Sequence, residues 1–194
     1  MIDDILPEPR YRIAAAKTIA APPEVVWNAL VALPMSALPF GFALTALRHL
    51  PDVVARNERR VRGTDTFLDA TPIPVLIRDE PRLVVSAGVS QAWKLVGGLP
   101  GPRLDVVGFR AWRVPGWIRV AMSFELTPLD GGRSTLLATE TRVAPTDRRT
   151  ARTFAVYWLV IGVSSALIRR EVVARVRRRA LAAVRTTAAD APAG

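Results

Sequence analysis

The feature that most limits how this chain folds is a long helical segment at its C-terminal end. From about Thr150 to Arg185 the sequence contains no proline and one glycine, Gly162. Apolar or small side chains recur there at three- and four-residue steps, which aligns them along one side of a helix. This stripe consists of Phe154, Trp158, Ile161, Ser165, Val172, Val176 and Ala183. A stripe of this length needs a large apolar partner surface, and only the middle of the chain offers one.

The segments before this helix are predicted to be mainly strands. Tyr11–Ile19 is the first, and Pro22-Pro23-Glu24 predicts that a short helix begins directly after it. A second short helical region is predicted over 35–50. Further strands are predicted over 64–70, 73–78, 83–95, 106–114, 117–127 and 134–143. The last two flank Asp130-Gly131-Gly132, a strong hairpin signal.

Together these elements predict an α+β fold. A curved antiparallel sheet of about six or seven strands is expected to wrap around the C-terminal helix. Two short helices are expected after the first strand, with the helices gathered on one face of the sheet. The 194 residues suffice for one domain, predicted over 1–185. The small, polar residues 186–194 are predicted to form a disordered tail.

The composition limits the chemistry that this chain can perform. It has no cysteine, which excludes disulfides and thiolate zinc sites, and its single histidine, His49, cannot form a histidine metal cluster. We therefore expect neither a metal nor a cofactor. The N-terminal segment has no basic region followed by an apolar run, so a cytoplasmic protein is expected.

The net charge of +10 comes almost entirely from arginine. Arginine as general solubilising charge and attraction to an anionic membrane surface are the two explanations that we retain. Nucleic acid is not expected as a partner, because basic residues are not interleaved with aromatic ones in a recognised module. The arginines from Arg169 to Arg185 are predicted to lie mostly on a solvated helix face.

The order of these segments resembles the START/SRPBCC superfamily of helix-grip proteins, which includes polyketide cyclases and lipid-transfer domains. The phrase from Ala21 to Trp27, A-P-P-E-V-V-W, follows a first strand as it does in that superfamily. The chain is similar to an uncharacterised actinobacterial-type group through segments 5–8, 88–93, 139–143, 157–158 and 165–170. The resemblance covers roughly residues 5–182 and implies a helix-grip fold, whereas functions in the superfamily differ widely.

One part of the long helix departs from that resemblance. Similar proteins usually carry arginines at positions that correspond here to Ala155, Val156, Leu159 and Gly162. On a helical wheel a second apolar face lies opposite Phe154 and Trp158; it is formed by Val156, Val160, Val163 and Leu167. Cover by another segment of the chain, contact with a partner such as a second copy, and contact with a membrane are the three alternatives.

Ligand-contacting residues are predicted where the sheet faces the helix. Gln91 and Trp93 are expected to share the helix-facing side of their strand, where a polar group among apolar ones can orient a ligand. An ordinary core in which Gln91 binds the backbone is the alternative. The full set of predicted contacts is Val89, Gln91, Trp93, Met122, Phe124, Phe154, Trp158, Ile161 and Ser165.

Glu140, Arg142 and Tyr157 are the candidate catalytic residues. Glu140 and Arg142 lie two apart on one strand, so they point to the same side. A two-residue turn at Asp130-Gly131 would pair Met122 with Thr139 and send both charges outward, as a surface ion pair. A three-residue turn would pair Met122 with Glu140 and send them into the cavity, where they would be candidate acid/base groups.

Three functions follow from this reading. The first is binding of a small hydrophobic or amphipathic ligand, such as a lipid, a polyketide or an aromatic metabolite, between sheet and helix. The second is a cyclase- or dehydratase-like enzyme that uses the same cavity, although no complete catalytic constellation is present. The third is an interaction protein that uses the second apolar face of the helix, with a homodimer or a peripheral membrane contact as the outcome.

Overall fold

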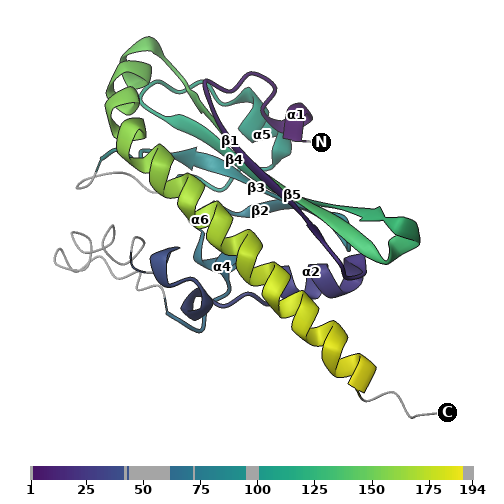
Figure 1. Ribbon diagram of the computed structural model, residues 1–194. Coiled ribbons are helices and arrows are strands. Elements are labelled where there is room, and N and C mark those ends of the chain that lie inside the picture. Colours follow the sequence, from purple (N-terminus) through teal and green to yellow (C-terminus); the bar gives the residue numbers. More distant parts are fainter. Residues whose placement is uncertain (1, 42, 44–61, 72, 95–100, 190–194) are drawn as a thin grey trace.

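A computed structural model describes residues 2–41, 43, 62–71, 73–94 and 101–189. Within them the chain forms an α+β fold in which one long helix, α6 (Arg148–Ala189), crosses one face of an antiparallel sheet (Figure 1). The sheet has five strands in the order β1-β5-β4-β3-β2. They are β1 (Tyr11–Ile19), β2 (Val75–Asp79), β3 (Leu83–Ser90), β4 (Ile118–Leu129) and β5 (Ser134–Pro145). The short helical elements are α1 (Ile2–Ile5), α2 (Pro23–Val31), η1 (Met35–Ala37), α4 (Phe67–Ala70), α5 (Val106–Ala111) and η2 (Asp130–Gly132).

The sheet has fewer strands than predicted because two expected strands are short helices. The segment 64–70 contains α4 and the segment 106–114 contains α5. Each of these helices begins at a side chain that caps it. The amide of Asp69 donates to Thr66 Oγ1 at 3.2 Å, and the amide of Gly108 donates to Asp105 Oδ1 at 2.7 Å. A cap satisfies a helix amide that would otherwise lack a partner, and this outweighs the strand propensity of a short apolar run.

Two predicted helical regions compare with the structure as follows. The region expected over 35–50 begins with η1, and its residues 42 and 44–50 lie outside the described residues. The long helix starts at Arg148 and continues to Ala189, a few residues beyond the predicted range at each end. Residues 190–194 lie outside the described part of the chain.

Helices cover both faces of the sheet, which corrects the expectation that they gather on one. On the inner face, defined here as the face that α6 crosses, the core includes Leu30 of α2, Phe124 of β4 and Val176 of α6. On the opposite, outer face, a second core joins Ile5 of α1 to Phe109 of α5. Successive residues of a strand point to opposite faces, so each central strand supplies both cores.

A third apolar cluster joins the start of α6 to the inner face. We call it the aromatic group; it consists of Tyr11, Trp93, Phe154, Tyr157 and Trp158. The ring of Tyr11 lies 4.8 Å from that of Trp158 and 5.4 Å from that of Phe154, centroid to centroid. Gly162 leaves room for this arrangement, because a Cβ there would lie 3.2 Å from the Trp158 ring. The single glycine of the long helix therefore has a packing role.

Candidate functional site

The side of α6 that faces the sheet changes character along its length. At its start Phe154 is buried in the aromatic group, and further along Val172 and Val176 are fully buried against α2 and the sheet. Between these two apolar ends, Ile161 and Ser165 are only half-buried. We call the stretch from Ile161 to Arg169 the middle section, and it is here that the interface is polar.

Arg169 is the central residue of the middle section. It follows Ser165 by one helical turn, so both point towards the sheet. Arg169 is 5% exposed, and its Nη1 donates to Thr139 Oγ1 of β5 at 2.6 Å. Its Nε is buried without a hydrogen-bond partner, and no carboxylate pairs with its guanidinium in the described part of the chain. Burial lowers the pKa of Arg169 to about 10, partly offset by the charge of Glu140. The guanidinium is thus a buried cation that no carboxylate of the described residues contacts directly.

Hydroxyl groups without partners accompany this cation on the inner face. Thr141 lies two residues after Thr139 on β5 and therefore points to the same side. Thr141 pairs with Met122 of β4, which pairs in turn with Ser86 of β3, so the three form a row across the sheet. The hydroxyls of Ser86 and Thr141 are buried and have no hydrogen-bond partner among the described residues, and the same holds for the hydroxyl of Tyr11 in the aromatic group. Buried polar groups are normally satisfied, so this face suits a ligand or water that would satisfy them.

Most of the predicted ligand contacts gather around this region. Trp93, Phe154 and Trp158 meet in the aromatic group, with the rings of Trp93 and Phe154 5.9 Å apart. Met122 and Phe124 point inward from β4 into the inner-face core. Ile161 and Ser165 lie in the middle section. The half-buried ring of Tyr157 lies 5.5 Å from that of Phe154.

Two predicted contacts lie elsewhere. Val89 points to the outer face, where it joins the core made with α1 and α5. The predicted strand 83–95 ends at Ser90, and the turn that follows brings Trp93 to the inner face instead of leaving it in line with Val89. Gln91 lies in this turn, and its Nε2 donates to the carbonyl of Gly116 at 2.9 Å. This bond corresponds to the alternative given for Gln91 in the sequence analysis, in which its side chain binds the backbone.

Glu140 and Arg142 also lie on the outer face, not in the space under α6. In the observed register Met122 pairs with Thr141 and Glu140 pairs with Ser123, which neither predicted turn anticipated. Leu129 pairs with Ser134, so the connecting loop contains four residues. Asp130, Gly131 and Gly132 all have positive φ, at 52°, 68° and 86°, and this conformation sets the loop length.

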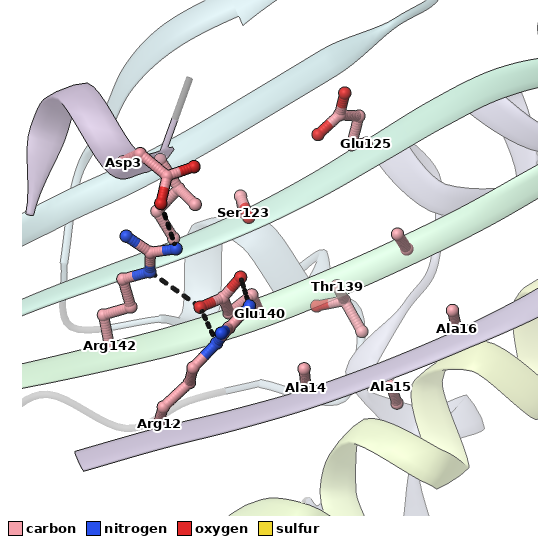
Figure 2. Close-up of a pocket in the computed structure, with 12 residues that line it drawn as sticks. Asp3, Arg12, Ala14, Ala15, Ala16, Ser123, Glu125, Thr139, Glu140 and Arg142 are labelled. Atoms are coloured by element: carbon pink, nitrogen blue, oxygen red, sulfur yellow. Dashed lines mark hydrogen bonds and ion pairs between the residues drawn. The ribbon is translucent and has the colours of Figure 1, made fainter. Parts of the chain in front are cut away.

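The outer-face charges form a closed network beneath α1 (Figure 2). Arg142, 4% exposed, donates to Glu140 Oε1 and to Asp3 Oδ1 at 2.7 Å each, and to the carbonyl of Leu6 at 3.0 Å. Arg12 of β1 is the second partner of Glu140. The pair is therefore neither a solvent-exposed ion pair nor part of an inner cavity.

The pKa shifts in this network argue against a proton-transfer role. Burial alone would raise the pKa of Glu140, but hydrogen bonds and charges from Arg142 and Arg12 outweigh burial and lower it. For Arg142 burial acts to lower the pKa, and the bonds to Glu140 and Asp3 raise it. A carboxylate held ionised by two guanidinium groups is a weak base, which counts against Glu140 as an acid/base group.

Two cavities flank this network. One, of about 440 Å³, runs over the outer face above small residues of β1 and β5, including Ala14, Ala16 and Ala138 (Figure 2). The other, of about 210 Å³, lies between Ile5 and Arg119. Neither lies under α6, where ligand binding was predicted. In the first, the charges of Asp3, Arg12, Glu140 and Arg142 are already paired with one another, so it has less need of a ligand than the site at Arg169.

Sequence reasoning missed Arg169, because it was grouped with the arginines of a solvated face. A signal for it was present. Arg169 continues the four-residue steps of Ile161 and Ser165, which places it on the buried stripe and not opposite to it. Ser86, Thr139 and Thr141 carried no comparable signal, since polar residues on a strand normally face water.

Comparisons with known proteins leave the family open. No family model and no curated protein matches this sequence. An X-ray structure of a structural-genomics target from Mesorhizobium loti matches 87% of this chain and 96% of its own, with 13% identity and a TM-score of 0.39. A conserved protein from Geobacillus kaustophilus matches 88% of this chain and 95% of its own, with 12% identity and a TM-score of 0.41. These values are too low to support an argument about function, which therefore depends on the residues themselves.

Proposed function

We propose that the protein binds a small amphipathic carboxylic acid between the sheet and α6. The acidic head would lie at Arg169, and the apolar body would run along the middle section towards the aromatic group. The observation that carries this proposal is the buried guanidinium of Arg169, which has one hydroxyl partner and no carboxylate among the described residues. An unpaired buried charge is costly, and proteins retain such groups mainly where a function uses them.

The surroundings of Arg169 favour a singly charged, planar head group. A guanidinium presents parallel N–H donors that match the two oxygens of a carboxylate. One cation with hydroxyl neighbours balances one negative charge, whereas a phosphate monoester carries nearly two at neutral pH. Glu140 lies on β5 next to Thr139, the partner of Arg169, and points to the other face of the sheet. Its nearby carboxylate further disfavours a second negative charge on the ligand. The head group is therefore a carboxylate.

The apolar body of the ligand would lie along α6. Ile161 and Ser165 precede Arg169 at four-residue steps and are half-buried, so an apolar chain laid against them would complete their cover. Trp158 lies 11 residues before Arg169, which corresponds to about 16 Å along the helix axis. This length suits a medium-chain fatty acid or an aromatic acid of similar size.

The helix-grip resemblance supports the same reading. An antiparallel sheet with a long C-terminal helix across it is the arrangement that START/SRPBCC proteins use to hold apolar ligands, and we propose that this chain is a five-stranded member of that superfamily. The enzyme alternative is less favoured, because its two charged candidates, Glu140 and Arg142, lie on the other face of the sheet in a closed network.

Dodecanoic acid and dodecanol test the proposal as a matched pair that differs only in the head group. Calorimetric titration of the wild-type protein should show the acid binding at least tenfold more tightly than the alcohol. Arg169→Met should remove this preference, and Arg169→Lys should keep part of it, because a lysine retains the charge without the guanidinium geometry. Binding of the acid should stay constant between pH 7 and pH 9 and weaken above the pKa of Arg169, which is about 10.

Two outcomes would count against the proposal in different ways. If the acid and the alcohol bind equally well and Arg169→Met changes neither, an apolar site exists but its polar anchor is wrong. If neither compound binds, nor any aromatic acid of similar length, the site under α6 is not a ligand site.

A further inference from the structure

The first half of α6 exposes a row of large apolar side chains on the side that faces away from the sheet. We call it the exposed stripe; it consists of Val156, Leu159, Val160, Val163 and Leu167. Their exposed fractions are 71%, 75%, 72%, 63% and 44%. The spacing of three, four and seven residues keeps all five within one face of the helix. The described part of the chain therefore does not cover these side chains.

The same helix face carries arginines at both ends of the exposed stripe. At 100° per residue, Arg149 and Arg152 lie on this face before it and Arg170 lies on it after Leu167; all three are exposed. The whole of α6 contains ten arginines and one acidic residue, Glu171. Glu171 is already engaged, because its carboxylate accepts from the amides of Phe40 and Gly41. The face is thus apolar in the middle and positive at both ends.

This charge pattern argues against a second copy as the occupant. In a symmetric antiparallel pairing of two α6 helices centred on the exposed stripe, Arg152 of each copy would face Arg170 of the other. A parallel pairing would place Arg152 against Arg152. Either arrangement brings like charges together, and the face offers no acidic side chain to offset them.

The fold also argues against a membrane-spanning role. By length and composition α6 is apolar enough to cross a membrane, and only 11% of its most apolar window is buried. However, its other side is attached to the sheet through Trp158 and Tyr11 and through Arg169 and Thr139. A span would draw β1, which forms one edge of the sheet, into lipid with unpaired backbone groups. The helix can instead lie along a membrane surface.

We propose that the exposed stripe docks α6 onto an anionic membrane surface, in the plane of the interface. Its apolar side chains would enter the headgroup boundary, and Arg149, Arg152 and Arg170 would contact anionic headgroups on either side. The contact would hold the middle section of α6 close to the lipid, but it depends only on the outward face of the helix. It is therefore independent of whether an acid binds at Arg169.

Vesicle co-sedimentation tests the proposal. The wild-type protein should bind vesicles of equal phosphatidylcholine and phosphatidylglycerol at least tenfold better than phosphatidylcholine alone, and added salt should weaken binding. Val160→Ser with Val163→Ser should lower binding by at least tenfold. Arg149→Gln, Arg152→Gln and Arg170→Gln together should remove the preference for the anionic lipid. Val107→Ser, at a valine that is 73% exposed on α5, is the matched control and should bind as the wild type does.

A second readout covers the case in which a variant folds poorly. Because the chain has no cysteine, Val160→Cys and Val107→Cys can each carry one environment-sensitive dye. The dye at position 160 should shift to the blue on anionic vesicles, and the dye at position 107 should not. Equal shifts at both positions, or equal binding to both vesicle types, would overturn the proposal. A dimer in analytical ultracentrifugation that Val160→Ser with Val163→Ser dissociates would replace it with a contact between two copies.

Discussion

Arg142 and Arg169 lie against opposite faces of the sheet, and they show how differently the same side chain can be used. The guanidinium of Arg142 donates to the carboxylate of Glu140 on β5, to that of Asp3 on α1 and to the carbonyl of Leu6. Arg169 has one hydrogen-bond partner among the described residues, the hydroxyl of Thr139. A guanidinium with a full set of partners stabilises the fold, whereas one without them destabilises it and is available to a ligand.

Removal of Arg142 is expected to be costly. Arg142→Met leaves Glu140, whose side chain is 13% exposed, with Arg12 as its remaining partner. We expect a loss of about 2–4 kcal/mol in the free energy of unfolding, measured in urea, because a largely buried carboxylate loses its main counter-ion. Arg82→Met, at an arginine that is 73% exposed, should change it by less than about 0.5 kcal/mol. A loss no larger than that of the control would show that the network has no structural weight.

In the ligand-free protein, removal of Arg169 should stabilise the fold, whereas removal of Arg142 should destabilise it. The pKa of Arg169 is lowered from 12.5, so the buried charge costs stability in full below about pH 10, and this cost is lost progressively as the pH rises above that value. We expect Arg169→Met to raise the free energy of unfolding at pH 7 by about 1–2 kcal/mol. A clear destabilisation would mean that Arg169 has partners which satisfy it, and the argument for a ligand at this residue would fail.

At the scale of elements, the start of α6 is fixed by one aspartate. Asp147 accepts from the amide and the hydroxyl of Thr150, at 2.8 Å and 2.6 Å, and from the amide of Gly116 at 2.7 Å. These bonds, that of the Thr150 hydroxyl foremost, lower the pKa of Asp147 well below its ordinary value of 3.8. The aspartate thus joins the N-terminus of the long helix to the loop before β4.

This cap predicts a pH dependence. A carboxyl with a lowered pKa contributes stability above its ordinary pKa of 3.8, and that stability is lost as the pH falls below it. The midpoint temperature of thermal unfolding of the wild type should therefore fall progressively below pH 4. Asp147→Asn should have a lower midpoint at pH 7, and its midpoint should depend less on acid. Asp79→Asn, at the end of β2, is the control and should follow the wild type. Identical acid profiles for Asp147→Asn and the wild type would contradict the assignment.

At the scale of the whole molecule, the sheet has a core on each face, and both should unfold together. Leu6, beside α1, is fully buried in the outer core although it lies near the end of the chain. Leu6→Ala should lower the free energy of unfolding by about 3 kcal/mol, because it leaves a cavity in that core. Val107→Ala, at an exposed valine of α5, should change it by less than about 0.5 kcal/mol. A small effect at Leu6 would mean that the N-terminal segment is not part of the cooperative core.

The sequence by itself determined the elements whose pattern is long or strict. β1 forms over the predicted Tyr11–Ile19, and α6 forms over the predicted range and a few residues beyond at each end. In both cases the local signal extends over enough residues to outweigh alternatives. Short apolar segments did not have that length. Caps by Thr66 and Asp105 stabilise the helices α4 and α5 in segments that were predicted to be strands.

Only the tertiary structure decided which charges are buried and by what. A four-residue loop, two residues longer than the shorter predicted turn, fixed the register of β4 and β5 and so the face on which Glu140 and Arg142 lie. The N-terminal helix then covered them, which no local pattern near residue 140 could indicate. Likewise, Arg169 differs from its neighbour Arg170 only in the side of α6 on which it falls. Burial depends on contacts between segments far apart in the chain, so a residue's neighbours in sequence do not determine its charge environment.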